Sequence, residues 1–166
     1  MKFYILDNGW ETLDKSFFIA GANSATASNR NPETEWINIP IQAYLIEHED
    51  GWILFDTGCD PDWERNWPAF IPEQSPYYVT EEQLLLNRLA QLGVAPEDIR
   101  YVVISHLHVD HAGNLHHFKN AQVIVSDTEI LGGATQIGLV FLIRGFLGSF
   151  GIGEGLPLAV YLNGNG

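Results

Sequence analysis

The feature that most constrains this chain is a cluster of histidines directly after an apolar segment. Residues 101–104 (Y-V-V-I) are continuously apolar and mostly β-branched, which is typical of a strand buried on both faces. Residues 105–114 then read S-H-L-H-V-D-H-A-G-N and place three histidines and one aspartate within six positions. The cluster is therefore predicted to lie at the end of a buried strand in an α/β architecture.

The side chains in this cluster are the types that bind transition metals. Because side chains alternate along extended backbone, His106 and His108 are expected to point the same way and to bind one ion. Asp110 continues that alternation and His111 diverges from it, so four donors in so short a loop suit two neighbouring ions better than one. Imidazole with carboxylate favours zinc (Zn²⁺), with iron or manganese as alternatives. Gly113 is expected to let the chain turn sharply after the ligands.

Two neighbouring metal ions predict a hydrolase for esters, lactones or amides. Divalent ions about 3.5–4 Å apart hold a bridging hydroxide and polarise a substrate carbonyl. Metal binding also lowers the pKa of water to about 7, so that hydroxide is available at neutral pH.

Other conspicuous residues are predicted to be structural. His116 and His117 are not required by the two-metal arrangement and are expected to be ordinary solvated residues. Cys59 is expected to be a small packed residue, because a metal-bound hydroxide already supplies a nucleophile. Four aromatic side chains are assigned to the core rather than to an acyl-chain pocket: Trp36, Trp52, Trp63 and Trp67.

The rest of the chain alternates predicted strands with one clear helix. The predicted strands cover residues 2–6 (ending at a turn over 7–9), 39–46, 52–56, 101–105 and 122–126, and the second and third form a hairpin. Residues 20–35 read as a loop, and residues 57–79 as irregular.

The helix is predicted from its first turn. Thr80-Glu81-Glu82-Gln83 has the form of a capping box. Leu85, Leu89 and Leu92 make one apolar stripe, and Gly93 suits the left-handed end of the helix.

Composition limits the classes of partner. The 166 residues carry 21 acidic and 8 basic side chains, a formal charge of −13, which disfavours nucleic acid and anionic membranes because both reward clustered Lys and Arg. A single cysteine excludes an internal disulfide, and the first seven residues do not read as a secretory leader. A cytoplasmic protein is expected.

The motif in residues 105–111 resembles the H-x-H-x-D-H signature of the metallo-β-lactamase superfamily, and Asp56-Thr57-Gly58 resembles its D-T-G strand end. More narrowly, residues 1–10, 31–48, 53–62 and 105–114 resemble N-acyl homoserine lactonases. The resemblance implies an αβ/βα sandwich with a dinuclear zinc site that opens an acyl homoserine lactone or a related lactone or ester.

The resemblance also assigns roles to residues. His106 and His108 would bind the first zinc, and Asp110 and His111 the second. Asp110 would also handle protons during ring opening and is therefore the candidate catalytic residue. Asp56 would support the metal loop without binding an ion itself.

The resemblance covers the first half of that fold. The family takes further ligands from later in the chain, but no histidine follows His117, and the later carboxylates are Asp127, Glu129 and Glu154. Residues 132–166 hold 10 of the 16 glycines. We therefore expect residues 1–131 to be the N-terminal half of a metallo-β-lactamase-like domain and 132–166 an atypical glycine-rich, apolar tail, from truncation or a frame shift.

Two other functions stay open. One is a non-catalytic half-domain that binds metal weakly or not at all, because half the family's ligands are missing. The other is a thioester hydrolase of the glyoxalase II kind. The sequence does not determine the oligomeric state.

Overall fold

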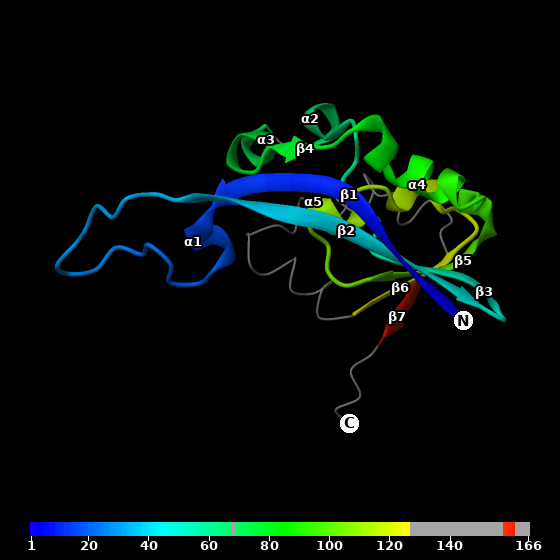
Figure 1. Cartoon of the computed structure of the whole chain (residues 1–166). Coiled ribbons are helices and arrows are strands. Elements are labelled where there is room, and N and C mark those ends of the chain that lie inside the picture. The colour runs from blue at the N-terminus through cyan, green and yellow to red at the C-terminus, as the bar shows by residue number, and fades with distance from the viewer. Residues whose placement is uncertain (68, 127–157, 162–166) are drawn as a thin grey trace, which may run out of the picture.

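The chain folds around one mixed β-sheet. The computed structural model describes residues 1–67, 69–126 and 158–161. The described strands are β1 (Lys2–Asp14), β2 (Trp36–His48), β3 (Gly51–Phe55), β4 (Tyr77–Tyr78), β5 (Ile99–Ile104), β6 (Gln122–Ser126) and β7 (Leu158–Tyr161). They form a seven-stranded sheet in the order β4-β1-β2-β3-β5-β6-β7 (Figure 1). The predicted α/β class is confirmed.

Short helices connect these strands. The α-helices are α1 (Lys15–Phe18), α2 (Trp63–Asn66), α3 (Phe70–Gln74), α4 (Leu85–Gln91) and α5 (Val109–Ala112). The 3₁₀ helices are η1 (Glu81–Gln83), η2 (Pro96–Asp98) and η3 (Leu115–His117). In the described part of the chain, no helix has both the length and the apolar character needed to cross a bilayer.

The sheet changes from antiparallel to parallel at β3. The predicted hairpin is confirmed, since β2 pairs antiparallel with β3 across the turn at residues 48–51. From β3 onward, β5, β6 and β7 pair in parallel. Parallel neighbours need a crossover connection, which α4 supplies between β3 and β5. The end of β3 and the end of β5 therefore meet at one edge of the sheet.

The first strand is longer than predicted. The turn expected at residues 7–9 is instead an irregularity within β1, where the register against β2 shifts between Asp7 and Trp10. Gly9 has φ +89°, and a Cβ there would collide with the carbonyl oxygen of Tyr78 in β4. Glycine at this position thus allows the backbones of β1 and β4 to approach closely, and β1 continues beyond it to Asp14.

The helix predicted from Thr80 is present in two pieces. Gln83 Oε1 accepts a hydrogen bond from the Thr80 amide at 3.0 Å, as a capping box requires. Leu84, with ψ 133°, then separates η1 from α4. Leu85 and Leu89 are buried as predicted, but Leu92 is 39% exposed because the helix has ended at residue 91. Gly93 ends it with φ +72°.

The segment predicted to be irregular contains α2, α3 and β4. It contributes Trp63 and Trp67 to the core, as predicted, and Trp52 packs against that core from β3. Trp36 is 52% exposed, so its assignment to the core is wrong: it lies at the start of β2, where that strand pairs with the last residue of β1.

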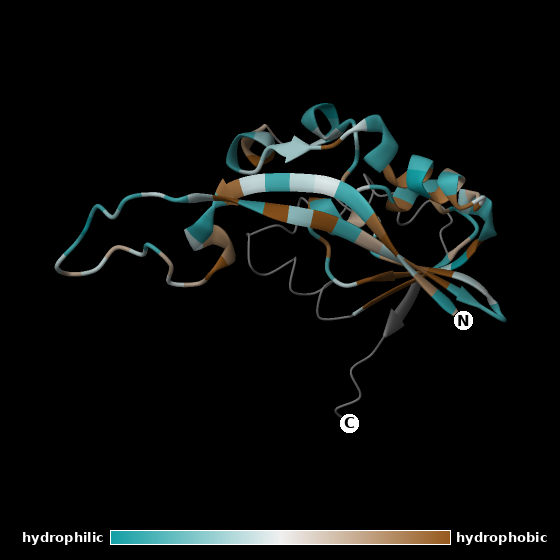
Figure 2. Cartoon of the chain, viewed as in Figure 1, coloured by the Kyte–Doolittle hydropathy of each residue, from teal (hydrophilic) through white to brown (hydrophobic). Residues whose placement is uncertain are grey.

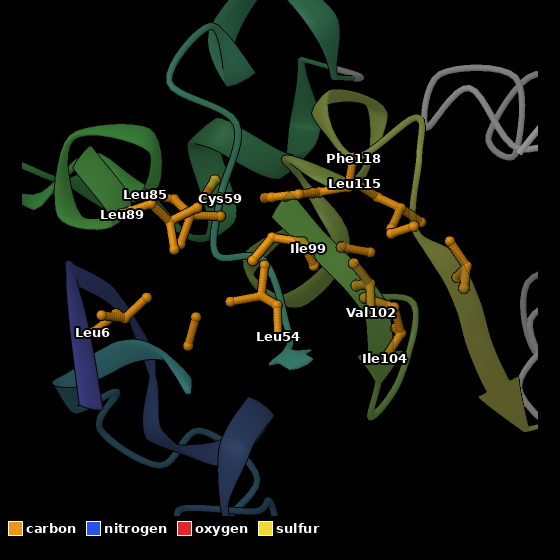
Figure 3. Packing of buried hydrophobic residues seen from close by; sticks show 14 of the residues in the cluster. Leu6, Leu54, Cys59, Leu85, Leu89, Ile99, Val102, Ile104, Leu115 and Phe118 are labelled. Atoms are coloured by element: carbon orange, nitrogen blue, oxygen red, sulfur yellow. The ribbon is translucent and has the colours of Figure 1, made fainter. Parts of the chain in front are cut away.

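The core lies between the sheet and the helices. Figure 3 shows Leu54 and Val102 of the central strands beneath Leu85, Leu89, Leu115 and Phe118. On α4, apolar residues face the sheet and hydrophilic ones face outward (Figure 2). The residues that follow β3 (from Asp56) and β5 (from Ser105) therefore lie next to a well-packed hydrophobic core.

The opposite face of the sheet is apolar as well. Ile5, Tyr44 and Phe55 are paired neighbours across β1, β2 and β3, and Ile5 is 62% exposed. The Tyr44 ring stacks on Phe3 at 5.6 Å and meets Phe55 edge-on at 6.2 Å. A sheet that is apolar on both faces is typical of a middle layer.

Most of the predicted tail lies outside the described residues. The proposed boundary after residue 131, and the truncation or frame shift, stay predictions. Within 132–166 the structure describes Leu158–Tyr161, which pair in parallel with Val123–Ser126 of β6.

Candidate metal centre

The histidine motif forms the connection from β5 into α5. His108 is still extended, with φ −74° and ψ 157°, and caps the helix that begins at Val109. The amides of His111 and Ala112 donate to the His108 carbonyl at 3.1 and 3.0 Å. The alternation predicted for His106 and His108 is thus possible, but its extension to Asp110 is wrong, because Asp110 and His111 lie on a helical turn.

The structure brings all four predicted ligands together. The ring centroids of His106 and His108 are 4.6 Å apart, and those of His106 and His111 are 3.9 Å apart. His111 Nε2 lies 2.9 Å from Asp110 Oδ2. The motif therefore presents three imidazoles and a carboxylate at one place, as the donor set of a zinc-type centre requires.

The donors do not close around a single point. Among the described residues, the one group of three whose ligand atoms all lie within 4.8 Å of one another is His48, Glu49 and Asp50, on the β2–β3 turn. Exposed acidic groups of that kind are common without a metal. The rings of His106 and His111, which are predicted to bind different ions, lie closer together than those of His106 and His108, so the division of the four donors between two ions stays a prediction.

Asp56 connects the end of β3 to the motif. Its side chain is buried, with 3% of the residue exposed, and its φ of +59° is in the left-handed region. Oδ1 accepts the Ser105 amide at 2.8 Å, and Oδ2 accepts the Ser105 hydroxyl at 2.8 Å and Nδ1 of His111 at 2.9 Å. The residue predicted to support the metal loop therefore contacts it directly.

The backbone after Asp56 is tied to α5 at several points. The Thr57 amide donates to the His111 carbonyl at 2.6 Å. Asn114, which is 3% exposed, donates from Nδ2 to the carbonyls of Thr57 and Cys59, both at 2.8 Å. These contacts hold the ligand helix against the D-T-G turn.

Gly113 acts differently from its prediction. Its φ of −60° and ψ of −36° are ordinary helical values, so it makes no sharp turn. A Cβ at Gly113 would instead collide with the amide nitrogen of Asp60 and lie 2.6 Å from the carbonyl oxygen of Val109. Glycine is needed here because two backbone segments approach closely.

The charges of the motif residues are coupled. Burial opposes protonation of His111, but hydrogen bonds to Asp110 and Asp56 outweigh it and raise the pKa of His111 to about 10. Burial likewise works against ionisation of Asp110, yet its bond to His111 lowers the pKa of that carboxyl. Burial, with the positive charge of His111, lowers the pKa of His106.

Glu11 is a neighbour of the site that sequence reasoning missed. It lies on β1, and its Oε2 accepts a hydrogen bond from the Ser75 hydroxyl at 2.6 Å. Burial and then the nearby charge of Asp110 raise the pKa of Glu11 to about 7. Nothing local in the sequence marks this residue, whereas Ser105 and Asn114 at least flank the motif.

The residues predicted to be structural divide into two cases. Cys59 is buried, and burial, with the charge of Asp110 next, raises the pKa of its thiol, which agrees with a packed and unreactive residue. His116 and His117 were expected to be solvated, but both are half-buried, with their rings 3.9 Å apart. They belong to η3, which packs on the core through the buried side chains of Leu115 and the following Phe118.

The fold and this site define a class of protein. Residues 37–139 match the sequence pattern of the Metallo-beta-lactamase superfamily. The chain therefore belongs to the metallo-β-lactamase superfamily.

Within that superfamily the chain is similar to lactonases. It is 39% identical over 131 residues to the N-acyl homoserine lactonase AiiB of Agrobacterium fabrum, covering 77% of this chain and 48% of that protein. It is 36% identical over 132 residues to the N-acyl homoserine lactonase AiiA of Bacillus thuringiensis subsp. kurstaki, covering 77% and 49%.

A solved structure agrees with these relatives. An N-acyl homoserine lactone hydrolase, with the product N-hexanoyl-L-homoserine at its catalytic metal centre, superposes with a TM-score of 0.71 at 30% identity. The match covers 97% of this chain and 59% of that one. The chain thus corresponds to part of the metallo-β-lactamase fold. It spans about half the length of the curated relatives it matches.

Proposed function

We propose that this chain carries half of a dinuclear metal centre for lactone hydrolysis. His106 and His108 would hold the first ion, and Asp110 and His111 the second. The observation that carries the proposal is the convergence of these four side chains, with His106 close to both His108 and His111. Imidazole and carboxylate donors fit zinc, and also iron or manganese.

The substrate class follows from the relatives. The proteins it matches over 77% of its length are N-acyl homoserine lactonases, so an acyl homoserine lactone or a related lactone or ester is the proposed substrate. Two bound ions would make hydroxide available at neutral pH and polarise the lactone carbonyl. Asp110, which is held ionised beside His111, would accept a proton from the attacking water and return it to the ring oxygen as the ring opens.

We expect this chain by itself to hydrolyse lactones weakly. Two ligands for each ion fall short of the three or so that a catalytic metal site normally provides. No histidine follows His117 in the sequence to complete either set. This favours, as the second candidate, a half-domain that binds metal weakly and does not turn over substrate.

Metal analysis and a hydrolysis assay on the purified chain test the proposal. We expect zinc bound more weakly than micromolar and little opening of an acyl homoserine lactone, followed with a pH indicator. His106→Asn should abolish the zinc binding that remains, whereas His48→Gln should leave it unchanged. If His48→Gln abolishes it instead, the turn at residues 48–50 is the binding site and the proposal is wrong. Two tightly bound zinc ions with rapid turnover would show that the chain completes its own site.

A further inference from the structure

One hydroxyl lies between Asp56 and two of the candidate ligand rings. Ser105 Oγ is 2.8 Å from Asp56 Oδ2, 3.0 Å from His106 Nδ1 and 3.4 Å from His111 Nδ1. The Ser105 amide is also bound, at 2.8 Å, to Oδ1 of Asp56. The serine is therefore held by Asp56 from both its main chain and its side chain.

The direction of each hydrogen bond follows from proton counting. An ionised carboxylate only accepts, and a serine hydroxyl has one proton to donate. That proton points to Asp56, because the two oxygens would otherwise face each other at 2.8 Å without a proton between them. The hydroxyl then offers His106 only lone pairs, so Nδ1 of His106 has to be the donor.

The same carboxylate controls a second ring. His111 Nδ1 lies 2.9 Å from Asp56 Oδ2, closer than to Ser105, so it donates directly to Asp56. A histidine that donates from Nδ1 presents Nε2 as its metal-binding atom. Nε2 of His111 already faces Asp110, its proposed co-ligand, at 2.9 Å.

We propose that Ser105 is a positioning residue through which Asp56 sets the tautomer of His106, while Asp56 itself holds the proton on Nδ1 of His111. One buried carboxylate thereby prepares one histidine of each ligand pair, and both ions are bound through Nε2 of these two rings. This inference rests on the proposed metal centre for its function. Its proton arrangement, however, belongs to the metal-free chain and is measurable there.

The decisive experiment is a ¹H–¹⁵N spectrum of the histidine rings in the metal-free chain, recorded above neutral pH, where His106 is uncharged. The His106 signal is identified by its disappearance in His106→Asn. We expect protonated Nδ1 and bare Nε2 for His106 in the unaltered chain and in Ser105→Thr, which keeps the hydroxyl. In Ser105→Ala the population should shift toward protonated Nε2. Bare Nδ1 in the unaltered chain, or an identical tautomer in Ser105→Ala, would overturn the proposal.

Zinc affinity gives a second readout with the same variants. Loss of an outer partner of a metal ligand typically costs 10–100-fold in affinity, and the exposed position of Ser105 lets water replace part of its role. We therefore expect about a 10-fold loss in Ser105→Ala and near-complete retention in Ser105→Thr. Equal losses in both variants would contradict the relay. If no variant binds zinc but the tautomers are as expected, the proposed function fails while the positioning role of Ser105 stands.

Discussion

Nδ1 of His111 lies 2.9 Å from Oδ2 of Asp56, so the first residue of the D-T-G turn and the last predicted ligand of the motif form one partly buried pair. The two residues are 55 positions apart in the sequence. They meet because β3 and β5 are parallel neighbours whose ends reach the same edge of the sheet. The metal motif is therefore attached to the sheet by side chains as well as by its own strand.

Replacing Asp56 should weaken metal binding more than it weakens the fold. Asp56→Asn keeps the shape and tolerates the left-handed φ of +59°, but it removes the charge that His111 faces. We expect zinc affinity to fall 10–100-fold in a competition titration and the pKa of His111 to fall in an NMR titration. Unchanged values for both would contradict the role given to Asp56.

Asp56→Ala should add a backbone cost to that loss. A left-handed φ costs alanine about 1 kcal/mol, and three hydrogen bonds at the carboxylate disappear as well. Asn23→Ala is the matched control, because Asn23 also has a positive φ, of 51°, but is exposed. Urea unfolding should show a clearly larger destabilisation for Asp56→Ala than for Asn23→Ala.

Gly113→Ala should destabilise the chain by about 3 kcal/mol. The added methyl group meets backbone atoms of Asp60 and Val109, neither of which can rotate away. Gly93→Ala separates this crowding from the effect of backbone angle. Gly93 has φ +72° but open space around it, so we expect a cost of about 1 kcal/mol in the same denaturant titration. A smaller effect at Gly113 than at Gly93 would refute the close approach.

Metal uptake should release a proton from His111. With a pKa of about 10, His111 carries protons on both ring nitrogens at neutral pH, and an ion bound at Nε2 has to displace one. Isothermal titration calorimetry in buffers of different ionisation enthalpy should show about one proton released per ion at the second position. Affinity there should rise with pH until about pH 10. Heats that do not depend on the buffer would contradict this assignment.

Glu11→Gln should reduce the pH dependence of stability. The folded pKa of about 7 lies above the ordinary value of 4.5, so the folded chain holds this proton more tightly than the unfolded chain. The resulting stabilisation is complete below pH 4.5 and is lost as pH rises through 7. With partial exposure taken into account, the loss is about 1–2 kcal/mol. Thermal melts of the metal-free chain between pH 5 and 8 should show a flatter profile for Glu11→Gln, whereas Glu33→Gln, at an exposed position, should follow the unaltered chain.

Local patterns predicted five of the seven described strands and the helix that follows Thr80. The strand at residues 122–126, the β2–β3 hairpin and the helix end at Gly93 are all as expected, because apolar periodicity and turn residues act over a few positions. The errors have distant causes. β1 continues beyond the turn predicted at residues 7–9 because Gly9 packs closely against Tyr78 of β4. His116 and His117 are half-buried and not solvated because the neighbouring Phe118 packs into the core.

The sequence by itself predicted the candidate donor set, since His106, His108, Asp110 and His111 lie within six positions and their chemistry does not depend on the fold. The resemblance predicted that Asp56 supports this loop, but the tertiary structure alone decided which atoms make the contacts. Asp56 with Ser105, Asn114 with Thr57, and Ser75 with Glu11 are 49, 57 and 64 positions apart. No local pattern predicts such pairs. They form because strands distant in sequence share one sheet edge, where buried polar groups have to find partners among the residues that packing brings near.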